Sequence, residues 1–255
     1  MAEPVRHGDS ATLAAKFLAG HFRDGTAGMP TIPGPSTRSE SYRIQDCLVA
    51  ELGEIVAWKV GRGKSSPEPY CAPVLRQRLY QNDGRYRRPI HLSAASVEAE
   101  IGLVIGKDVP AGNRTYSRED ALALVDTVVP AIEILETRLA GAAAGEPFWK
   151  LADLQANGGV VFGPGTPRGN RTFRSARLSI DAPGVLGTSQ EVRHPFGDPA
   201  DLLQWMVNHA AHERGGLKRG QVVITGSYCG ILALSGPGAC RVEFDDVGCV
   251  KINLL

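Results

Sequence analysis

The chain has 255 residues, of which 43% are hydrophobic and 22% are charged. Its 28 Lys and Arg residues nearly balance its 27 Asp and Glu residues, so the formal net charge is +1. Many apolar side chains and little net charge argue against intrinsic disorder. The balanced charge also argues against a dedicated nucleic-acid binder, which needs a basic excess to neutralise phosphates.

Targeting and cysteine patterns give further exclusions. The first seven residues carry charges and no apolar core, unlike a secretory signal, and no stretch approaches about 18 consecutive apolar residues. The five cysteines are odd in number and contain no Cys-x-x-Cys pair, which argues against a disulfide framework and a thiolate zinc site. We therefore expect a cytoplasmic protein with reduced thiols and no association with membranes.

The first part of the chain is predicted to be helical. Apolar residues at helical spacing predict helices over about 11–22 and 39–52, joined by a connector rich in Pro, Gly and Ser at 29–36. No composition change divides the rest into separate cores. We expect a single domain over 1–255, with a mainly helical part at 1–53 and a β-rich catalytic part at 54–255.

The remainder is dominated by predicted strands. They fall at 55–60, 97–105, 131–135 (after a break at Pro130), 160–162, 178–180, 222–225, 240–244 and 249–254. Ser117 is predicted to cap a helix, and Asp198 followed by Pro199 predicts another that ends at Gly215. Strands with few intervening helices favour an α+β fold with a mixed, largely antiparallel sheet.

The Glu-Ala-Glu sequence at 98–100 is the most informative local pattern. In a strand, Glu98 and Glu100 share one face and lie roughly 6.5–7 Å apart, while the opposite face is apolar. Two carboxylates without a neighbouring His or Cys suit Mg²⁺ or Mn²⁺. The simpler alternative is a strand whose polar face is merely solvated.

Glu133 strengthens the metal hypothesis. It lies in a strongly apolar stretch, and a buried carboxylate needs a compensating cation or arginine. Arg138 is the structural alternative as its partner. As a third ligand, Glu133 would complete a set of carboxylates that leaves positions open for substrate and water.

Two further elements could take part in chemistry. Lys59 lies in the apolar run 55–60, where partial desolvation would lower its pKa and suit it to proton transfer; a lysine that merely extends to solvent is the alternative. Gly226 and Ser227 follow a predicted strand, where N–H groups and a hydroxyl could hold a carboxylate. Many β-turns share this pattern.

Other polar residues are assigned no catalytic role. His209 and His212 are interpreted as helix-surface residues, since the His-Glu-x-x-His pattern is absent. The basic segment 62–88 is interpreted as a solvated loop or as a mouth that attracts an anionic substrate. Cys229 has no His partner in the sequence and is not proposed as a nucleophile.

Taken in order, these elements resemble the 2-keto-4-pentenoate hydratase and 4-oxalocrotonate decarboxylase group of the fumarylacetoacetate hydrolase superfamily. The matching segments are Ala-Trp-Lys-Val-Gly (57–61), Val-Glu-Ala-Glu-Ile (97–101), Pro-Ala-Ile-Glu-Ile-Leu-Glu-Thr-Arg (130–138), Asp153 with Gln-Ala-Asn-Gly (155–158), and Gly-Leu-Lys-Arg-Gly-Gln-Val-Val-Ile-Thr-Gly-Ser (216–227). The closing Phe-Asp-Asp-Val-Gly-Cys-Val (244–250) is also similar. The resemblance covers almost the whole chain.

The resemblance implies a mixed β-sandwich roll with a helical N-terminal part, assembled into homo-oligomers. It implies that Glu98, Glu100 and Glu133 bind the metal, that Lys59 is the active-site lysine, and that Asn157 orients substrate or water. The implied reaction is hydration of a 2-hydroxy-2,4-dienoate or 2-oxo-4-enoate to a 4-hydroxy-2-oxo acid in aromatic catabolism, with water adding to the conjugated double bond. Ser227 and the Gly226 region would hold the carboxylate of this small-molecule 2-oxo acid.

The chain departs from the family pattern on one side of the site. No carboxylate follows Pro69, where hydratases of this group usually have one, and Glu136-Thr137-Arg138 replaces Asp-Ser-Arg. Residues 228–230 also differ. Three alternatives therefore remain open: decarboxylation, C–C bond hydrolysis, or a non-catalytic subunit in complex with a related decarboxylase or hydratase chain.

Overall fold

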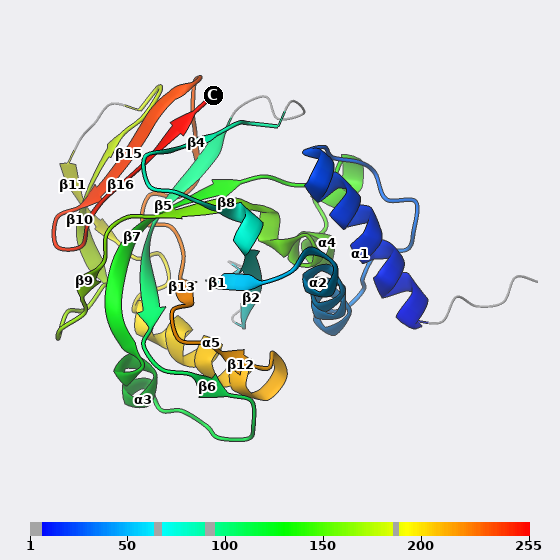
Figure 1. Cartoon of the computed structure of the whole chain (residues 1–255), viewed down its shortest axis with the longest axis horizontal. Helices are drawn as coiled ribbons and strands as arrows, with labels where there is room; N and C mark the ends of the chain where they lie inside the picture. Colours follow the sequence, from blue (N-terminus) through cyan, green and yellow to red (C-terminus); the bar gives the residue numbers. More distant parts are fainter. Residues whose placement is uncertain (1–6, 64–67, 90–94, 186–188) are drawn as a thin grey trace, which may run out of the picture.

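The computed structural model describes residues 7–63, 68–89, 95–185 and 189–255. Two long helices, α1 (His7–Asp24) and α2 (Arg38–Leu52), lie together on one side of the molecule (Figure 1). They confirm the two helices expected from the sequence. Thr37 caps α2 by accepting a hydrogen bond from the Glu40 N–H, which satisfies one of the free donors at the start of the helix.

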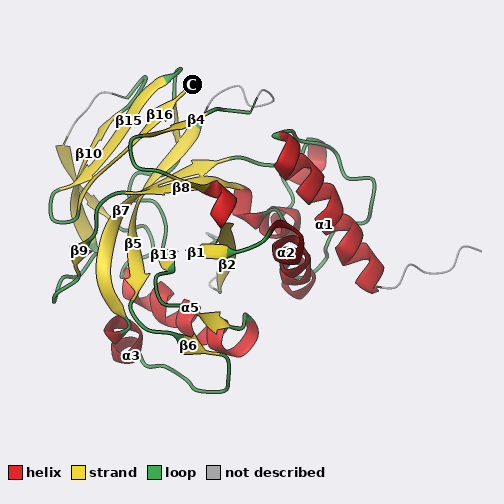
Figure 2. Cartoon of the chain, in the orientation of Figure 1, coloured by secondary structure: helices red, strands yellow, loops and turns green. Residues whose placement is uncertain are grey.

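A large curled sheet forms the centre of the molecule (Figure 2). Its nine strands are β1 (Ile55–Arg62), β2 (Pro69–Leu75), β3 (Leu79–Tyr80), β5 (Ser96–Ile105), β7 (Val125–Leu135), β8 (Asn157–Phe162), β9 (Thr166–Pro167), β13 (Val222–Ile224) and β14 (Leu232–Ala233). The order is β2-β1-β13-β5-β7-β8-β3, with β14 added beside β5 and β9 beside β7. Strand β1 is parallel to β13 and β3 is parallel to β8, whereas the other pairs are antiparallel.

A second sheet packs beside the first. It has the order β11 (Ser189–Arg193), β10 (Ser175–Asp181), β15 (Gly238–Phe244), β16 (Gly248–Leu254) and β4 (Gly84–Tyr86). The short strands β6 (Val109–Pro110) and β12 (Gly216–Leu217) pair separately. The remaining α-helices are α3 (Arg118–Ala123), α4 (Pro147–Ala152) and α5 (Pro199–Glu213). The expected α+β class with a mixed, largely antiparallel sheet is confirmed.

The two faces of β5 have different neighbours. Val97, Ala99 and Ile101 are buried in the main core, which also contains the apolar face of α5. The intervening residues Glu98 and Glu100 face the inside of the curl. The alternation expected for this strand is therefore confirmed, and it turns a row of acidic side chains toward the opposite wall of the sheet.

Pro130 does not break its strand, and this expectation was wrong. Strand β7 runs through it, and Pro130 lies opposite Ile101 of β5. On the other side of β7, the neighbouring strand changes from β9 to β8 at this point. A residue without an N–H therefore interrupts no continuous ladder there.

The basic segment 62–88 is not simply a solvated loop. Its described residues form β2, β3 and β4, while 64–67 lie outside the described residues. Arg78 is buried, and its guanidinium contacts the Glu136 carboxylate at 3.0 Å. The charges of this segment are thus partly structural, because a buried carboxylate needs a cationic partner.

Candidate metal centre

Three glutamates converge inside the curl of the sheet. Glu98 and Glu100 extend from β5, and Glu133 extends from β7 directly opposite Glu98 in the strand register. One carboxylate oxygen from each residue lies within 4.8 Å of the others. Glu100 and Glu133 are buried and Glu98 is partly buried, so bulk water cannot compensate the three charges.

Lys59 reaches this cluster from the opposite wall. Its ammonium group forms a close ion pair with Glu133 Oε1 and donates a hydrogen bond of 3.0 Å to the carbonyl oxygen of Gln155. Arg138, the alternative partner expected for Glu133, instead pairs with Asp153 at 2.6 Å. That expectation was wrong because the curl of the sheet brings a lysine 74 residues away closer than the neighbouring arginine.

The electrostatics of Lys59 also differ from the expectation. Burial alone would lower its pKa, but Glu133, Glu98 and Glu100 outweigh burial, and the pKa of Lys59 is raised. Burial, followed by the charge of Glu133, raises the pKa of both Glu98 and Glu100. In the absence of another cation, one ammonium group faces three crowded carboxylates.

The cluster fits a hard divalent cation on its own chemistry. The Glu133 Oε2 atom is buried and has no hydrogen-bond partner, which is costly for a carboxylate oxygen. The other groups that could ligate a metal are carboxylate oxygens, the donors that Mg²⁺ and Mn²⁺ prefer over zinc-type His and Cys sets. A divalent cation would supply the missing partner and balance the excess negative charge.

Asn157 is part of the same cluster. Its side-chain amide donates a hydrogen bond of 2.9 Å to Glu133 Oε1. Its backbone carbonyl accepts a hydrogen bond of 2.6 Å from the buried Arg138 guanidinium, which Asp153 holds in turn. Arg138 therefore fixes the segment that carries Asn157.

The turn after β13 contacts the cluster in a different way from that expected. The Gly226 N–H donates a hydrogen bond of 2.7 Å to Glu100 Oε2, so this donor already holds a carboxylate of the protein itself. The Ser227 hydroxyl donates to the Gly230 carbonyl at 2.9 Å and accepts from the Cys229 N–H at 3.3 Å. The turn thus orients Glu100 and lies beside the cluster.

A left-handed turn beneath Lys59 was missed from the sequence. Leu154, Gln155 and Ala156 all have φ between 53° and 56°, a conformation that costs most residues about 1–2 kcal/mol each. This turn points the Gln155 carbonyl at Lys59. None of the three residues is glycine or asparagine, so no residue type in this segment indicates the conformation.

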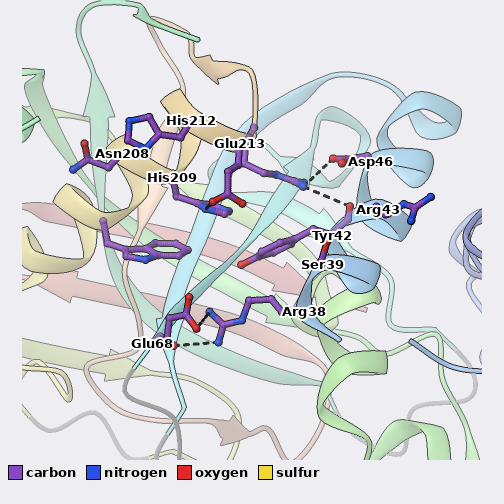
Figure 3. Close-up of a pocket in the computed structure, with 12 residues that line it drawn as sticks. Arg38, Ser39, Tyr42, Arg43, Asp46, Glu68, Asn208, His209, His212 and Glu213 are labelled. Atoms are coloured by element: carbon purple, nitrogen blue, oxygen red, sulfur yellow. Dashed lines mark hydrogen bonds and ion pairs between the residues drawn. The ribbon is translucent and has the colours of Figure 1, made fainter. Parts of the chain in front are cut away.

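A separate pocket of about 610 Å³ lies between α2 and α5 (Figure 3). His209 is stacked on Trp205 at 4.6 Å between ring centres, and its side chain is only 8% exposed. The expectation that His209 lies on the helix surface was therefore wrong. His212 is exposed, as expected. Three arginines and three carboxylates line this pocket, so its charge favours neither anions nor cations. Arg214 packs over Trp58, whose side chain lies on the opposite face of β1 from Lys59.

The family comparison agrees with this arrangement. The family model described as "Fumarylacetoacetate (FAA) hydrolase C-terminal" matches residues 59–253, which begin at Lys59 and include all three glutamates. The chain belongs to the fumarylacetoacetate hydrolase family. None of the helices in the described part of the chain is long and apolar enough to cross a membrane.

Curated relatives share low sequence identity with this chain. A 2-keto-4-pentenoate hydratase from Paraburkholderia xenovorans is 26% identical over 172 residues, which is 60% of each chain. A 4-oxalocrotonate decarboxylase from a Pseudomonas species is 28% identical over 165 residues, covering 64% of this chain and 62% of the relative. The match therefore spans only about 60% of the length of these relatives.

Solved structures support the fold. A 4-oxalocrotonate decarboxylase from Pseudomonas putida G7, complexed with magnesium and adipate, matches with a TM-score of 0.77 over 100% of both chains at 16% identity. A fumarylpyruvate hydrolase from Pseudomonas aeruginosa, in complex with Mn²⁺ and pyruvate, matches with a TM-score of 0.57 at 17% identity, covering 78% of this chain and 88% of that one. The fumarylacetoacetate hydrolase fold expected from the sequence is confirmed.

Proposed function

We propose that this protein is a lyase that requires Mg²⁺ or Mn²⁺ and hydrates a 2-hydroxy-2,4-dienoate, or its 2-oxo-4-enoate tautomer, to a 4-hydroxy-2-oxo acid. Water would add to the double bond that tautomerisation brings into conjugation with the keto group. The observation that carries the proposal is the convergence of Glu98, Glu100 and Glu133. One oxygen of the buried Glu133 carboxylate lacks a hydrogen-bond partner, and Lys59 pairs with the other. The names of the hydratase relatives and the metals in related structures support it.

The three glutamates would hold the cation, which when bound would stabilise negative charge on the keto oxygen of a 2-oxo acid. Lys59 would move a proton to or from the substrate during dienol–ketone tautomerisation. Asn157 would hold Glu133 in place, and the Gly226 N–H would do the same for Glu100. Ser227 and the turn from Gly226 onward would border the substrate carboxylate.

The direct test is loss of the dienol absorbance of 2-hydroxypenta-2,4-dienoate in the presence of Mg²⁺. Wild-type protein is expected to bleach it, and Lys59→Met, which lacks a proton carrier, is expected to be inactive while still binding metal. The exposed Lys218→Met variant serves as the control, since Lys218 pairs with Asp108 outside the site. An equal rate with and without wild-type protein would contradict the proposal.

Decarboxylation of a 4-oxalocrotonate-type substrate is the second candidate. It is favoured by one feature: from Pro69 to Arg78 the structure places no carboxylate near the cluster, and the preceding Glu68 is exposed and paired with Arg38. Decarboxylation needs no group to activate water. Release of CO₂ distinguishes it from hydration, and product mass distinguishes both from C–C bond hydrolysis.

Assembly is part of the same proposal. We expect homo-oligomers, and sedimentation of the purified chain tests this. If the chain is instead a non-catalytic partner, it will be inactive alone and will co-purify with a related decarboxylase or hydratase subunit.

A further inference from the structure

Tyr70 lies on β2, the strand that pairs with the Lys59 strand β1. In the β1–β2 register, Lys59 lies opposite Ala72 and Gly61 lies opposite Tyr70. Residues directly opposite each other in an antiparallel pair share a face, and so do residues two apart in one strand. The Tyr70 side chain therefore extends from the same face of the sheet as Lys59.

Gly61 provides the space for the tyrosine ring. A Cβ atom at Gly61 would lie 3.0 Å from Tyr70 Cε2 and 3.1 Å from both its Cζ and hydroxyl oxygen. Any larger residue would displace the ring. The absence of a side chain at Gly61 thus lets the phenol lie flat against β1, with its hydroxyl next to the strand that carries Lys59.

The strand register places Tyr70 on the side of Lys59 that is away from the apolar cluster around Ala57. Beyond Lys59 in one direction, Ala57 packs with Val74 and Val222 in a small apolar cluster. In the other direction lies Gly61. Strands β1 and β13 are parallel and Lys59 pairs with Ile224, so Gly61, two residues further along β1, lies on the side of Gly226. Tyr70 is partly exposed there, where a substrate could reach it.

The charges of the cluster act on the phenol. Burial raises the pKa of Tyr70; Lys59 opposes this, and Glu98, Glu133 and Glu100 add to it, so the net direction is upward. All four charged groups are therefore within electrostatic reach of the hydroxyl, which remains a hydrogen-bond donor at neutral pH.

We propose that Tyr70 is a substrate-binding residue whose hydroxyl donates a hydrogen bond to an oxygen of the 2-oxo acid held at the cluster. This inference rests on the proposed function and extends it, since it names a hydrogen-bond donor for the substrate. The ring forms one wall of the substrate site, and the hydroxyl supplies a neutral donor.

Tyr70→Phe tests the inference because it removes only the hydroxyl and keeps the ring over Gly61. Tyr80→Phe is the matched control, since Tyr80 packs edge-on against Tyr86 at 5.4 Å outside the site. Both variants are titrated calorimetrically with Mn²⁺ and then, when loaded, with oxalate as a mimic of a 2-oxo acid. We expect unchanged melting temperature and Mn²⁺ affinity in both, and roughly tenfold weaker oxalate binding in Tyr70→Phe alone.

The outcomes separate this inference from the function on which it rests. Equal oxalate affinity in Tyr70→Phe and wild type would overturn the role of Tyr70 and leave the metal centre intact. A parallel loss of Mn²⁺ affinity in Tyr70→Phe would also overturn it, because the phenol would then support the metal ligands. Wild-type protein that binds Mn²⁺ but no oxalate would contradict the proposed function itself.

Discussion

Glu100 is a residue whose local environment destabilises its charged form in the metal-free protein. It is buried, it accepts one backbone hydrogen bond from Gly226, and burial together with Glu133 and Glu98 raises its pKa well above the usual range. A cation bound at the cluster would compensate this buried negative charge. In the proposed metal centre, function and stability would therefore make opposite demands on this side chain.

The variant Glu100→Gln separates these two demands. Removing one negative charge should weaken Mn²⁺ binding by on the order of tenfold to a hundredfold, while the metal-free variant should melt at the same or a higher temperature than wild type. Calorimetric titration and thermal melts measure both quantities. The control is Glu191→Gln, an exposed position on β11. Unchanged Mn²⁺ affinity in Glu100→Gln would remove Glu100 from the metal site.

The residue scale also shows which parts of the site the sequence could predict. Glu98 and Glu100 could be paired because strand alternation alone places them on one face. The ion pair of Lys59 with Glu133 could not, because it forms across the curl between strands that are not neighbours in the sheet. The expected lowering of the Lys59 pKa failed for the same reason, since the three opposing carboxylates were unknown.

Among the structural elements, the turn at 154–156 holds strain next to the site. Ala156 is partly exposed and has φ of 56°. Glycine at this position would stabilise the folded state by removing the steric cost of the left-handed conformation. It would also stabilise the unfolded state by about 0.5–1 kcal/mol, because glycine has more conformational freedom there. We expect Ala156→Gly to leave the free energy of unfolding unchanged or to raise it by about 0.5–1 kcal/mol. Chemical denaturation measures this.

Ala50→Gly is the control for that comparison. Ala50 is exposed in the helix α2, where glycine should lower the free energy of unfolding by about 0.5–1 kcal/mol. Equal destabilisation by both substitutions would show that the turn carries no strain.

The loop before α5 contributes a pH-dependent element. His194 is buried, its ring nitrogens contact the Thr225 carbonyl and the Phe196 N–H, and burial lowers its pKa from 6.5 to about 4. Because the folded protein holds this imidazole neutral, its contribution to the free energy of unfolding is complete above pH 6.5 and is lost as the pH falls toward 4.

The variant His194→Gln should reduce this pH dependence, because glutamine can donate to Thr225 but does not titrate. The difference in free energy of unfolding between wild type and variant should change by up to about 3 kcal/mol between pH 7 and pH 4, with wild type losing more. Urea denaturation at several pH values measures it. Parallel curves for the two proteins would contradict the assignment to His194.

At the scale of elements, periodicity predicted the existence of the long helices and strands better than their connections. The helices α1, α2 and α5 each carry a recognisable apolar stripe or cap. Strand β7 was shortened in the prediction because Pro130 is usually a boundary, and only the pairing of β7 with β8 and β9 explains its tolerance. Short strands such as β3 and β4 carry too few residues to show a period.

For the molecule as a whole, the buried Arg78 side chain joins the helical N-terminal part to the sheet. Arg78 contacts the Glu136 carboxylate at 3.0 Å, donates to the Phe22 carbonyl of α1 at 2.9 Å, and lies over the Phe22 ring at 4.1 Å. The second apolar core continues this connection, since side chains from α1 and α2 pack there with Ala72 and Leu75 of β2. We propose that residues 1–53 and the β-rich part form one domain that unfolds cooperatively.

Replacing Arg78 by methionine tests this coupling. Among the described residues, the variant leaves the buried Glu136 with the Tyr86 hydroxyl, at 3.3 Å, as its one remaining side-chain donor, which should cost about 3–5 kcal/mol. For a chain of this length, that corresponds to a melting temperature roughly 6–20 °C lower. Arg76→Met, two residues away, breaks an exposed ion pair with Glu54 and should change the melting temperature far less, because solvent screens that pair. Helix content followed by circular dichroism and tryptophan fluorescence should report one coincident transition in both variants, because the two cores share β2. Two separate transitions would show that the helical part folds independently of the sheet. Equal melting temperatures for the two variants would contradict the stabilising role of Arg78.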